Sequence, residues 1–179
     1  MSQVPRSIRS LRRTTLYRGK IIHLIREVLK IHGKRVVRET ILHPGSVVIV
    51  PLINRSRIVF VRQYRHAIGR VILELPAGTL NPGEDPRVCA RRELEEETGW
   101  RAKRVRRIGQ FYPAPGVFSE QMTVFLAEGL TPVKAHPEPD ELLEPVIMPI
   151  RTVLAKIRSG TICDAKSIIG VLFAFERLA

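Results

Sequence analysis

Three glutamates in the segment 78–100 have a spacing that would place them on one face of a helix. Glu93, Glu96 and Glu97 stand at positions i, i+3 and i+4, so a helix would bring them within an arc of roughly 100°. Like charges at this spacing repel one another and destabilise a helix. Hard divalent cations such as Mg²⁺ prefer oxygen ligands and would relieve that repulsion. The spacing therefore predicts a metal-binding face suited to displacement at phosphorus.

Residues around the glutamates could hold them in position. Arg92 can reach Glu96 one turn later, and the loop Pro76–Gly78 can bring backbone carbonyl groups to the same cluster. A glutamate-rich run alone is most often a solvated surface helix. The fuller spacing is more specific, because its fixed identities would coincide by chance on the order of once in a million chains or more rarely. It comprises Gly78, Glu84, Arg92-Glu93-Leu94, Glu96-Glu97 and Gly99, followed by the apolar Trp100.

A helix is predicted to carry these residues. Asp85 is a suitable N-cap, Pro86 suits the first helical position, and Gly99 suits the C-terminal stop. We therefore expect a helix that runs to about Thr98. The preceding Asn81–Glu84 is typical of a tight turn.

The rest of the chain predicts strands mixed with a few helices, which indicates an α/β (α+β) architecture. Two strands at 16–32 and 34–43 are expected around a turn at His32-Gly33, with the first 15 residues mobile. Residues 131–140 contain three prolines and are expected to form a loop. The last helix should be capped by Asp164, with one apolar face. Further strands are predicted at 46–52, 57–64, 71–75, 105–112 and 121–127, helices at about 150–158 and 165–177, and the apolar face at Ile168, Ile169, Leu172 and Phe175.

Composition limits the class of protein. The 179 residues carry 30 Lys and Arg against 17 Asp and Glu, a net charge of +13, which favours anionic partners. The two cysteines form no CxxC pair, so neither a structural zinc site nor a disulfide framework is implied. No apolar run approaches the roughly 20 residues of a membrane span. We expect a single cytoplasmic domain with a short N-terminal extension.

The segment 78–100 resembles the box of the Nudix hydrolase family at every fixed position. The resemblance implies an α/β/α sandwich with a mixed sheet, here at residues 44–179, with an N-terminal basic arm and β-hairpin at 1–43. It implies hydrolysis of nucleoside diphosphate derivatives with Mg²⁺ or Mn²⁺, using two or three ions. By the same resemblance Glu93 and Glu97 are the principal metal ligands, Glu96 a further ligand or supporting group, the Ala77 carbonyl a backbone ligand, and Arg92 the residue that orients the glutamates.

Further motifs are similar to the ADP-ribose pyrophosphatase subgroup. They are Arg62–Arg65, Glu74–Gly78 and the loop Phe111–Gly116, in which Pro115 lies 16 residues after Gly99. This resemblance implies that the products are AMP and ribose 5-phosphate, and that Ala114 lies among the substrate-binding residues. Arg65 is our candidate for a phosphate or ribose contact, because its fork suits bidentate recognition of oxygens. Arg38 is a weaker candidate, since arms of this kind cross to a partner subunit in the subgroup, where a homodimer is expected.

The attacking water needs a base, which the subgroup supplies from a mobile loop after the sheet. Glu141 matches that place best, and Glu138 is second. Pro139 stands where some relatives carry the loop glutamate, so the assignment stays open between the two.

Other functions are compatible with parts of the sequence. The same box could act on NADH, another nucleotide sugar or a dinucleoside polyphosphate. The basic clusters at 6–20 and 101–107 could belong to a nucleic-acid-binding module, but aromatic residues are only 6% of the chain and are not interleaved with those charges, which disfavours a stacking platform.

Overall fold

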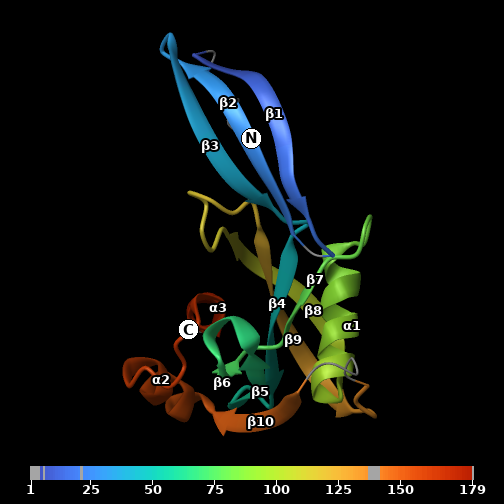
Figure 1. The fold of residues 1–179 in the computed structure, drawn as a ribbon. Coiled ribbons are helices and arrows are strands. Elements are labelled where there is room, and N and C mark those ends of the chain that lie inside the picture. Colours follow the sequence, from blue (N-terminus) through green and yellow to red (C-terminus); the bar gives the residue numbers. More distant parts are fainter. Residues whose placement is uncertain (1–4, 6, 21, 137–141, 179) are drawn as a thin grey trace. The chain divides into compact units, whose positions relative to one another are not determined.

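The computed structural model describes residues 5, 7–20, 22–136 and 142–178 (Figure 1). The chain forms two compact units. The N-terminal unit consists of the chain up to Pro44 together with Tyr112–Glu120, and the larger unit consists of Gly45–Phe111 and the chain from Gln121 onward. No helix among the described residues is long and apolar enough to span a bilayer.

The N-terminal unit is a three-stranded antiparallel sheet in the order β1-β2-β3. Its strands are β1 (Ile8–Arg18), β2 (His23–Ile31) and β3 (Lys34–Leu42). The turn at His32-Gly33 is confirmed, with φ angles of 47° and 80°. The expectation that the first 15 residues are mobile is wrong from Ile8 onward, because β1 pairs with β2 from Ile8 to Arg18, while residues 1–4 and 6 lie outside the described residues. The expected single strand at 16–32 is also wrong: the Gly19 amide bonds the Ile22 carbonyl at 2.9 Å where the chain turns between β1 and β2.

The larger unit is built on a mixed seven-stranded sheet. The main path runs β10-β5-β4-β9-β8, with β6 beside β5 and β7 beside β4. β4 pairs with β9 in parallel and with β5 and β7 antiparallel, which confirms the predicted mixed sheet. The strands are β4 (Ser46–Ile53), β5 (Arg57–Arg65), β6 (Arg70–Glu74), β7 (Ala77–Thr79), β8 (Trp100–Phe111), β9 (Met122–Pro132) and β10 (Leu143–Pro149).

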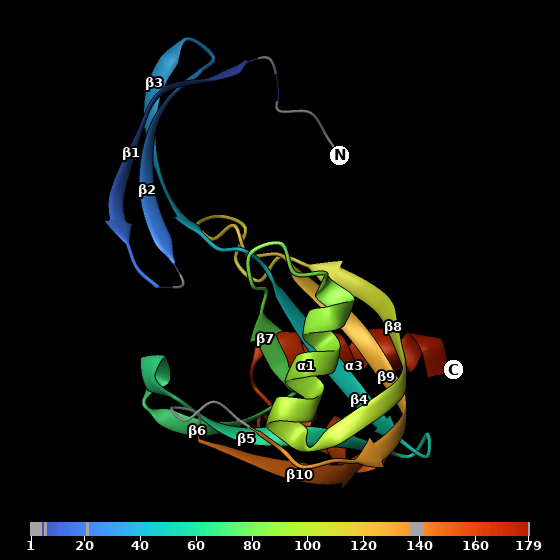
Figure 2. The ribbon, with the colours of Figure 1, turned by 90° about the vertical axis from the view of Figure 1, so that its right-hand side faces the viewer.

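Helices cover both faces of this sheet, as Figure 2 shows, which confirms the expected sandwich. β4 is buried along its whole length, and its alternate side chains enter two cores. Val47 and Ile49 pack with Leu94 of α1 (Pro86–Thr98). Val48 and Val50 pack with the opposite layer, which contains α2 (Ile150–Arg158) and α3 (Ala165–Leu178). The central strand thus fixes α1 on one face and the C-terminal helices on the other.

Two strands and one helix face differ from the sequence-based expectation. No strand was predicted at 143–149, where β10 lies at the edge of the sheet, a position that tolerates its Pro145 and Pro149. The three-residue β7 was also not predicted. In α3, Ile168 and Phe175 of the expected face pack against the core as partly buried residues. Leu172 is 53% exposed, whereas Val171 and Ala174 are fully buried, so the buried face is partly rotated from the one expected.

Candidate active site

α1 begins and ends where its local chemistry predicts. The Asp85 carboxylate accepts hydrogen bonds from the amides of Arg87 at 2.8 Å and Val88 at 3.3 Å. Pro86 occupies the first turn, and Gly99 ends the helix in the left-handed conformation with φ 69°. Because Leu94 is fully buried against the sheet, the rotation of α1 about its axis is fixed. This rotation sets where the three glutamates lie.

Two of the glutamates lie against β7. The side chain of Glu97 is buried, and its Oε2 accepts a hydrogen bond from the Ala77 amide at 3.1 Å. The Glu93 carboxyl group lies over Gly78 so closely that a Cβ on Gly78 would be 1.9 Å from the Glu93 Cδ. A glycine is therefore required at this position to seat Glu93. The helix and β7 together bring Glu93, Glu97 and the backbone of Ala77 to one place.

Arg92 connects the acidic residues to one another. Its Nη1 is 2.8 Å from Glu93 Oε1 and 3.0 Å from Glu96 Oε2. Its Nε and Nη2 donate to the two oxygens of Glu84 at 3.1 and 3.2 Å. These hydrogen bonds hold the pKa of Glu84 below its ordinary value and raise that of Arg92. One guanidinium thus counters the repulsion between three carboxylates.

The donor set of this site fits a hard divalent cation. The side chains of Glu93, Glu96 and Glu97 and the carbonyl of Ala77 would supply oxygen ligands, which suit Mg²⁺ or Mn²⁺. Within the described ranges no three acidic, His or Cys side chains converge as a ready cage. Glu93 and Glu96 point to Arg92 instead, so both carboxylates would turn to meet an ion.

An ion-pair network beside this site was not predicted. The Arg65 Nε and Nη2 donate to the two oxygens of Glu74 at 2.8 and 2.7 Å, and the Lys166 ammonium also contacts Glu74. Burial disfavours ionisation of Glu74, but the bonds from Arg65 and Lys166 outweigh it and lower its pKa. The pKa of Arg65 is raised, mainly by its hydrogen bonds to Glu74 and to a smaller degree by the charge of Glu97. Arg65 therefore lies within electrostatic reach of the acidic face.

The remaining predicted residues lie elsewhere or outside the described part of the chain. Arg38 is on β3 of the N-terminal unit, exposed, with its Nη1 donating to the Val37 carbonyl at 3.0 Å. Ala114 is in the loop of the same unit, and its carbonyl accepts from Val117 and Phe118 at 3.1 and 2.9 Å. Glu138 and Glu141 fall outside the described residues.

Sequence reasoning brought together Glu93, Glu96, Glu97, Arg92 and Ala77, and the structure places them side by side. It included Glu74 only as part of the motif Glu74–Gly78 and gave it no role, and it did not single out Lys166. Glu74 could have been noticed as an acid within an apolar strand, whereas Lys166 is 92 residues away and gives no local signal.

Comparison with known proteins relates this architecture to one family. The model of the NUDIX domain matches residues 42–166. An ADP-ribose pyrophosphatase of Bacillus subtilis is 36% identical over 162 residues, 89% of this chain and 88% of that protein. The methanol dehydrogenase activator of Bacillus methanolicus is 33% identical over 168 residues, which cover 92% of this chain and 91% of that protein. The crystal structure of an ADP compounds hydrolase has the same fold, with a TM-score of 0.86, 24% identity, and coverage of 99% of this chain and 97% of that one.

Proposed function

The chain belongs to the Nudix hydrolase family, and from that premise we propose that it hydrolyses the pyrophosphate of ADP-ribose to AMP and ribose 5-phosphate with Mg²⁺ or Mn²⁺. The observation that carries this proposal is the seating of Glu93 and Glu97 against β7, with Gly78 leaving room for the Glu93 carboxyl group. The substrate is supported by the similarity to the Bacillus subtilis ADP-ribose pyrophosphatase along nearly the whole chain.

The proposed metal ligands are Glu93, Glu96, Glu97 and the Ala77 carbonyl, holding two or three ions. When bound, such ions neutralise charge on the pyrophosphate and lower the pKa of a bound water. Arg92 orients the glutamates through its contacts with Glu93 and Glu96.

Arg65 is the proposed contact for a phosphate or ribose oxygen. Glu74 takes up the Nε and Nη2 of its guanidinium, so a substrate oxygen would be bound through Nη1. Because the Arg65 side chain is 40% exposed while that of Glu74 is 1% exposed, the guanidinium is held from its buried side and presented to solvent. Lys166 supports this position by pairing with the same carboxylate.

Glu141 is the proposed base or loop ligand, with Glu138 as the alternative. Single-turnover measurements on Glu141→Gln and Glu138→Gln test the choice. We expect Glu141→Gln to slow the chemical step more than Glu138→Gln, and a larger effect of Glu138→Gln would reverse the assignment.

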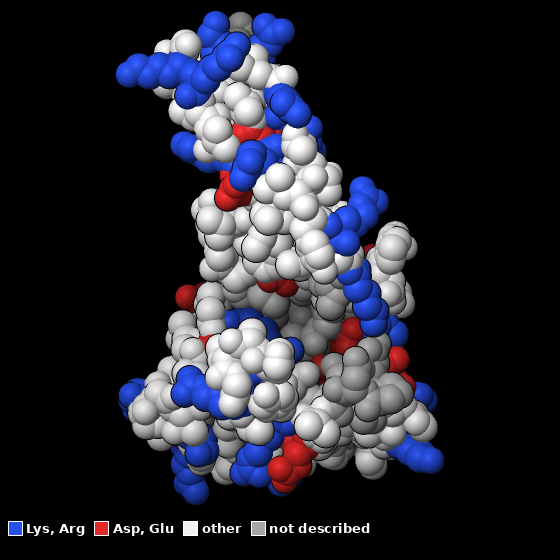
Figure 3. Space-filling model, in the orientation of Figure 1, with Lys and Arg blue, Asp and Glu red and all other residues white. Residues whose placement is uncertain are grey.

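A homodimer is proposed, with the N-terminal arm at 1–43 contributing Arg38 and the loop contributing Ala114 to the partner's substrate site. The exposed face of the arm seen in Figure 3 carries many Lys and Arg side chains, which suits an anionic substrate. Gel filtration with activity measured across the peak tests this, and an active monomer would contradict it. A cytoplasmic location is part of the same proposal.

The reaction is tested with a substrate panel in the presence of Mg²⁺, with the products identified. ADP-ribose should be cleaved faster than NADH, GDP-mannose and a dinucleoside polyphosphate, and a faster reaction with any of these would change the proposed substrate. Glu97→Gln should remove most turnover. Glu95→Gln is the matched control on the same helix, because Glu95 pairs with Arg101 at 2.8 Å and is not among the proposed metal ligands.

A further inference from the structure

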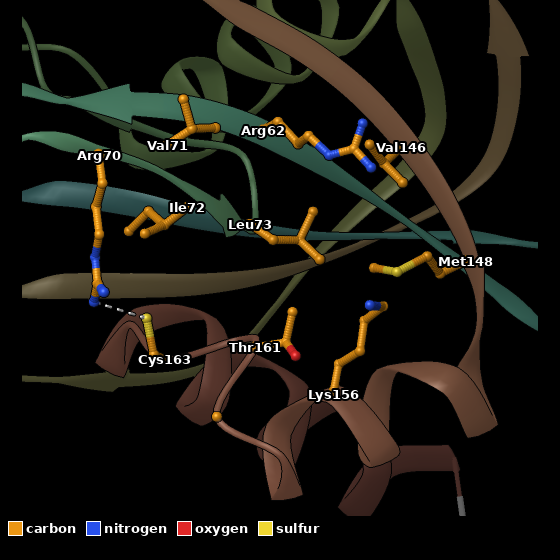
Figure 4. Close-up of a pocket in the computed structure, with 11 residues that line it drawn as sticks. Arg62, Arg70, Val71, Ile72, Leu73, Val146, Met148, Lys156, Thr161 and Cys163 are labelled. Carbon is orange, nitrogen blue, oxygen red and sulfur yellow. Dashed lines mark hydrogen bonds between the residues drawn. The ribbon is translucent and has the colours of Figure 1, made fainter.

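A cavity lies on the face of the sheet opposite α1. It has a volume of about 330 Å³, at the small end of the range typical of ligand pockets. Its walls come from β5, β6, β10, α2 and the connection between α2 and α3 (Figure 4). Leu73 and Met148, which form part of the cavity wall, belong to the core shared with α2 and α3. The cavity is therefore separate from the proposed metal site.

Three cationic side chains line this cavity. Arg62, Arg70 and Lys156 come from three different elements, β5, β6 and α2. Figure 4 shows the Lys156 side chain rising from α2 with its amine between Thr161 and Met148. Three positive charges around a small cavity create a field that favours an anion, and a dianion above a monoanion.

The anions that face these cations within the described residues are few and exposed. Arg62 pairs with Glu144 at 3.1 Å, but both side chains are more than half exposed, so the pair contributes little and can exchange for a ligand. Arg70 is directed to the sulfur of Cys163 at 3.9 Å, a weak acceptor. The cavity thus holds more positive charge than its own residues neutralise.

The remaining wall is apolar. Ile72, Leu73, Val146 and Met148 provide aliphatic and thioether surface beside the charges. A fully hydrated inorganic anion would gain nothing from this surface, whereas an anion with a compact apolar group would bury it there. We propose that this cavity is a binding site for a small phosphomonoester that carries an apolar group.

Cys163 allows the occupancy of the cavity to be measured without an activity assay. It lines the cavity and is exposed, whereas Cys89 is fully buried in the other core. The rate at which N-ethylmaleimide alkylates Cys163 therefore reports the state of the cavity. Cys89 should stay unlabelled as long as the protein is folded, which gives each variant an internal check.

The experiment uses phenyl phosphate as the probe, with benzoate and inorganic phosphate as the two partial probes. Phenyl phosphate should slow the alkylation of Cys163 in a saturable way. Its apparent Kd should be lower than that of either partial probe. Lys156→Gln should raise the apparent Kd for phenyl phosphate roughly tenfold, as expected for losing one charged hydrogen bond. Lys103→Gln, an exposed lysine on β8, is the matched control and should leave it unchanged.

Three results would overturn the proposal. The first is the absence of saturable protection, and the second is equal protection of the Lys156→Gln variant. The third is a partial probe that binds as tightly as phenyl phosphate. Tight binding of benzoate would show that the site does not select the phosphate, and tight binding of inorganic phosphate would show that it does not select the apolar group.

Discussion

Replacing Gly78 with alanine should inactivate the enzyme without unfolding it. The new Cβ would lie 1.9 Å from both Cδ and Oε1 of Glu93 and 2.3 Å from its Cγ. These atoms are the end of a flexible side chain, so Glu93 would turn away while the strand stays in place. Gly78 does not adopt a positive φ angle, so alanine adds no backbone strain.

The expected effect on stability is small. Forcing one methyl group into a packed site costs typically 1–3 kcal/mol, and the lower entropy of the unfolded alanine chain offsets about 0.4–1 kcal/mol of this. Since the obstructing side chain can move, we expect a net loss of about 1 kcal/mol, or about 3 °C in Tm. Thermal unfolding followed by circular dichroism measures it.

The expected effect on turnover is larger. A displaced Glu93 would no longer serve as a metal ligand. We expect turnover to fall by at least roughly 10–100-fold, which is the effect of removing a residue that only supports a metal ligand. The assay is Mg²⁺-dependent release of AMP from ADP-ribose. If Gly78→Ala acts through Glu93, adding it to Glu93→Gln should cause almost no further loss, because the two changes remove one function.

The double-mutant cycle decides between this reasoning and a general distortion of the site. Independent losses that multiply in the double variant would show that Gly78 acts by some route other than Glu93. Full activity of Gly78→Ala would show that the Glu93 carboxylate need not lie against β7.

Three further predictions concern stability and reactivity. Asp85→Ala should lower the free energy of unfolding by about 1 kcal/mol, because the N-cap of α1 is lost. Urea unfolding measures this, and an unchanged unfolding midpoint would contradict the capping role. Glu74→Gln should destabilise the protein at pH 7 by about 3 kcal/mol, the low end for breaking a buried pair, since Arg65 is partly exposed. Because the pKa of Glu74 in the folded protein lies below its ordinary 4.5, the difference in free energy of unfolding between wild type and Glu74→Gln is fully present above pH 4.5 and is lost as pH falls through the folded pKa. Urea unfolding should therefore show a smaller difference in free energy at pH 3 than at pH 7, and a larger difference at pH 3 would refute this reasoning. Burial and the nearby carboxylates raise the pKa of Cys89 to about 12, so only roughly one molecule in ten thousand carries its thiolate at pH 8. A thiol reagent should therefore react with one cysteine, Cys163, in the native protein and with both cysteines in urea.

Local chemistry made α1 predictable, because its N-cap, its proline and its terminal glycine are all encoded within the helix and its immediate neighbours. Asp85 and Gly99 mark the same boundaries in the sequence and in the structure. The turn at His32-Gly33 was predictable for the same reason. In contrast, β1 depends on its partner: its polar, arginine-rich sequence forms a strand because β2 satisfies its backbone hydrogen bonds.

The same distinction applies to the candidate site. The spacing of Glu93, Glu96 and Glu97 needs only the geometry of one helix. The position of Arg65 depends on Glu74 and on Lys166, which lies on α3 across the connection from α2. Glu74 lies only nine residues after Arg65, on the strand paired with β5, but no periodicity links either residue to Lys166, so this partner could be found only in the folded chain.

The contacts of Arg92 explain how α1 can carry so many like charges. Its guanidinium binds Glu84 through two hydrogen bonds, and Glu93 and Glu96 through its third nitrogen. One positive charge against three negative ones leaves the face acidic, so a divalent cation is still attracted. If Glu93 turned to an ion as proposed, the fork to Glu84 would still hold Arg92 in place, because those two bonds use nitrogens that Glu93 does not contact. Glu84 would then act through Arg92, by keeping the guanidinium beside the acidic face while the proposed metal ligands change partners.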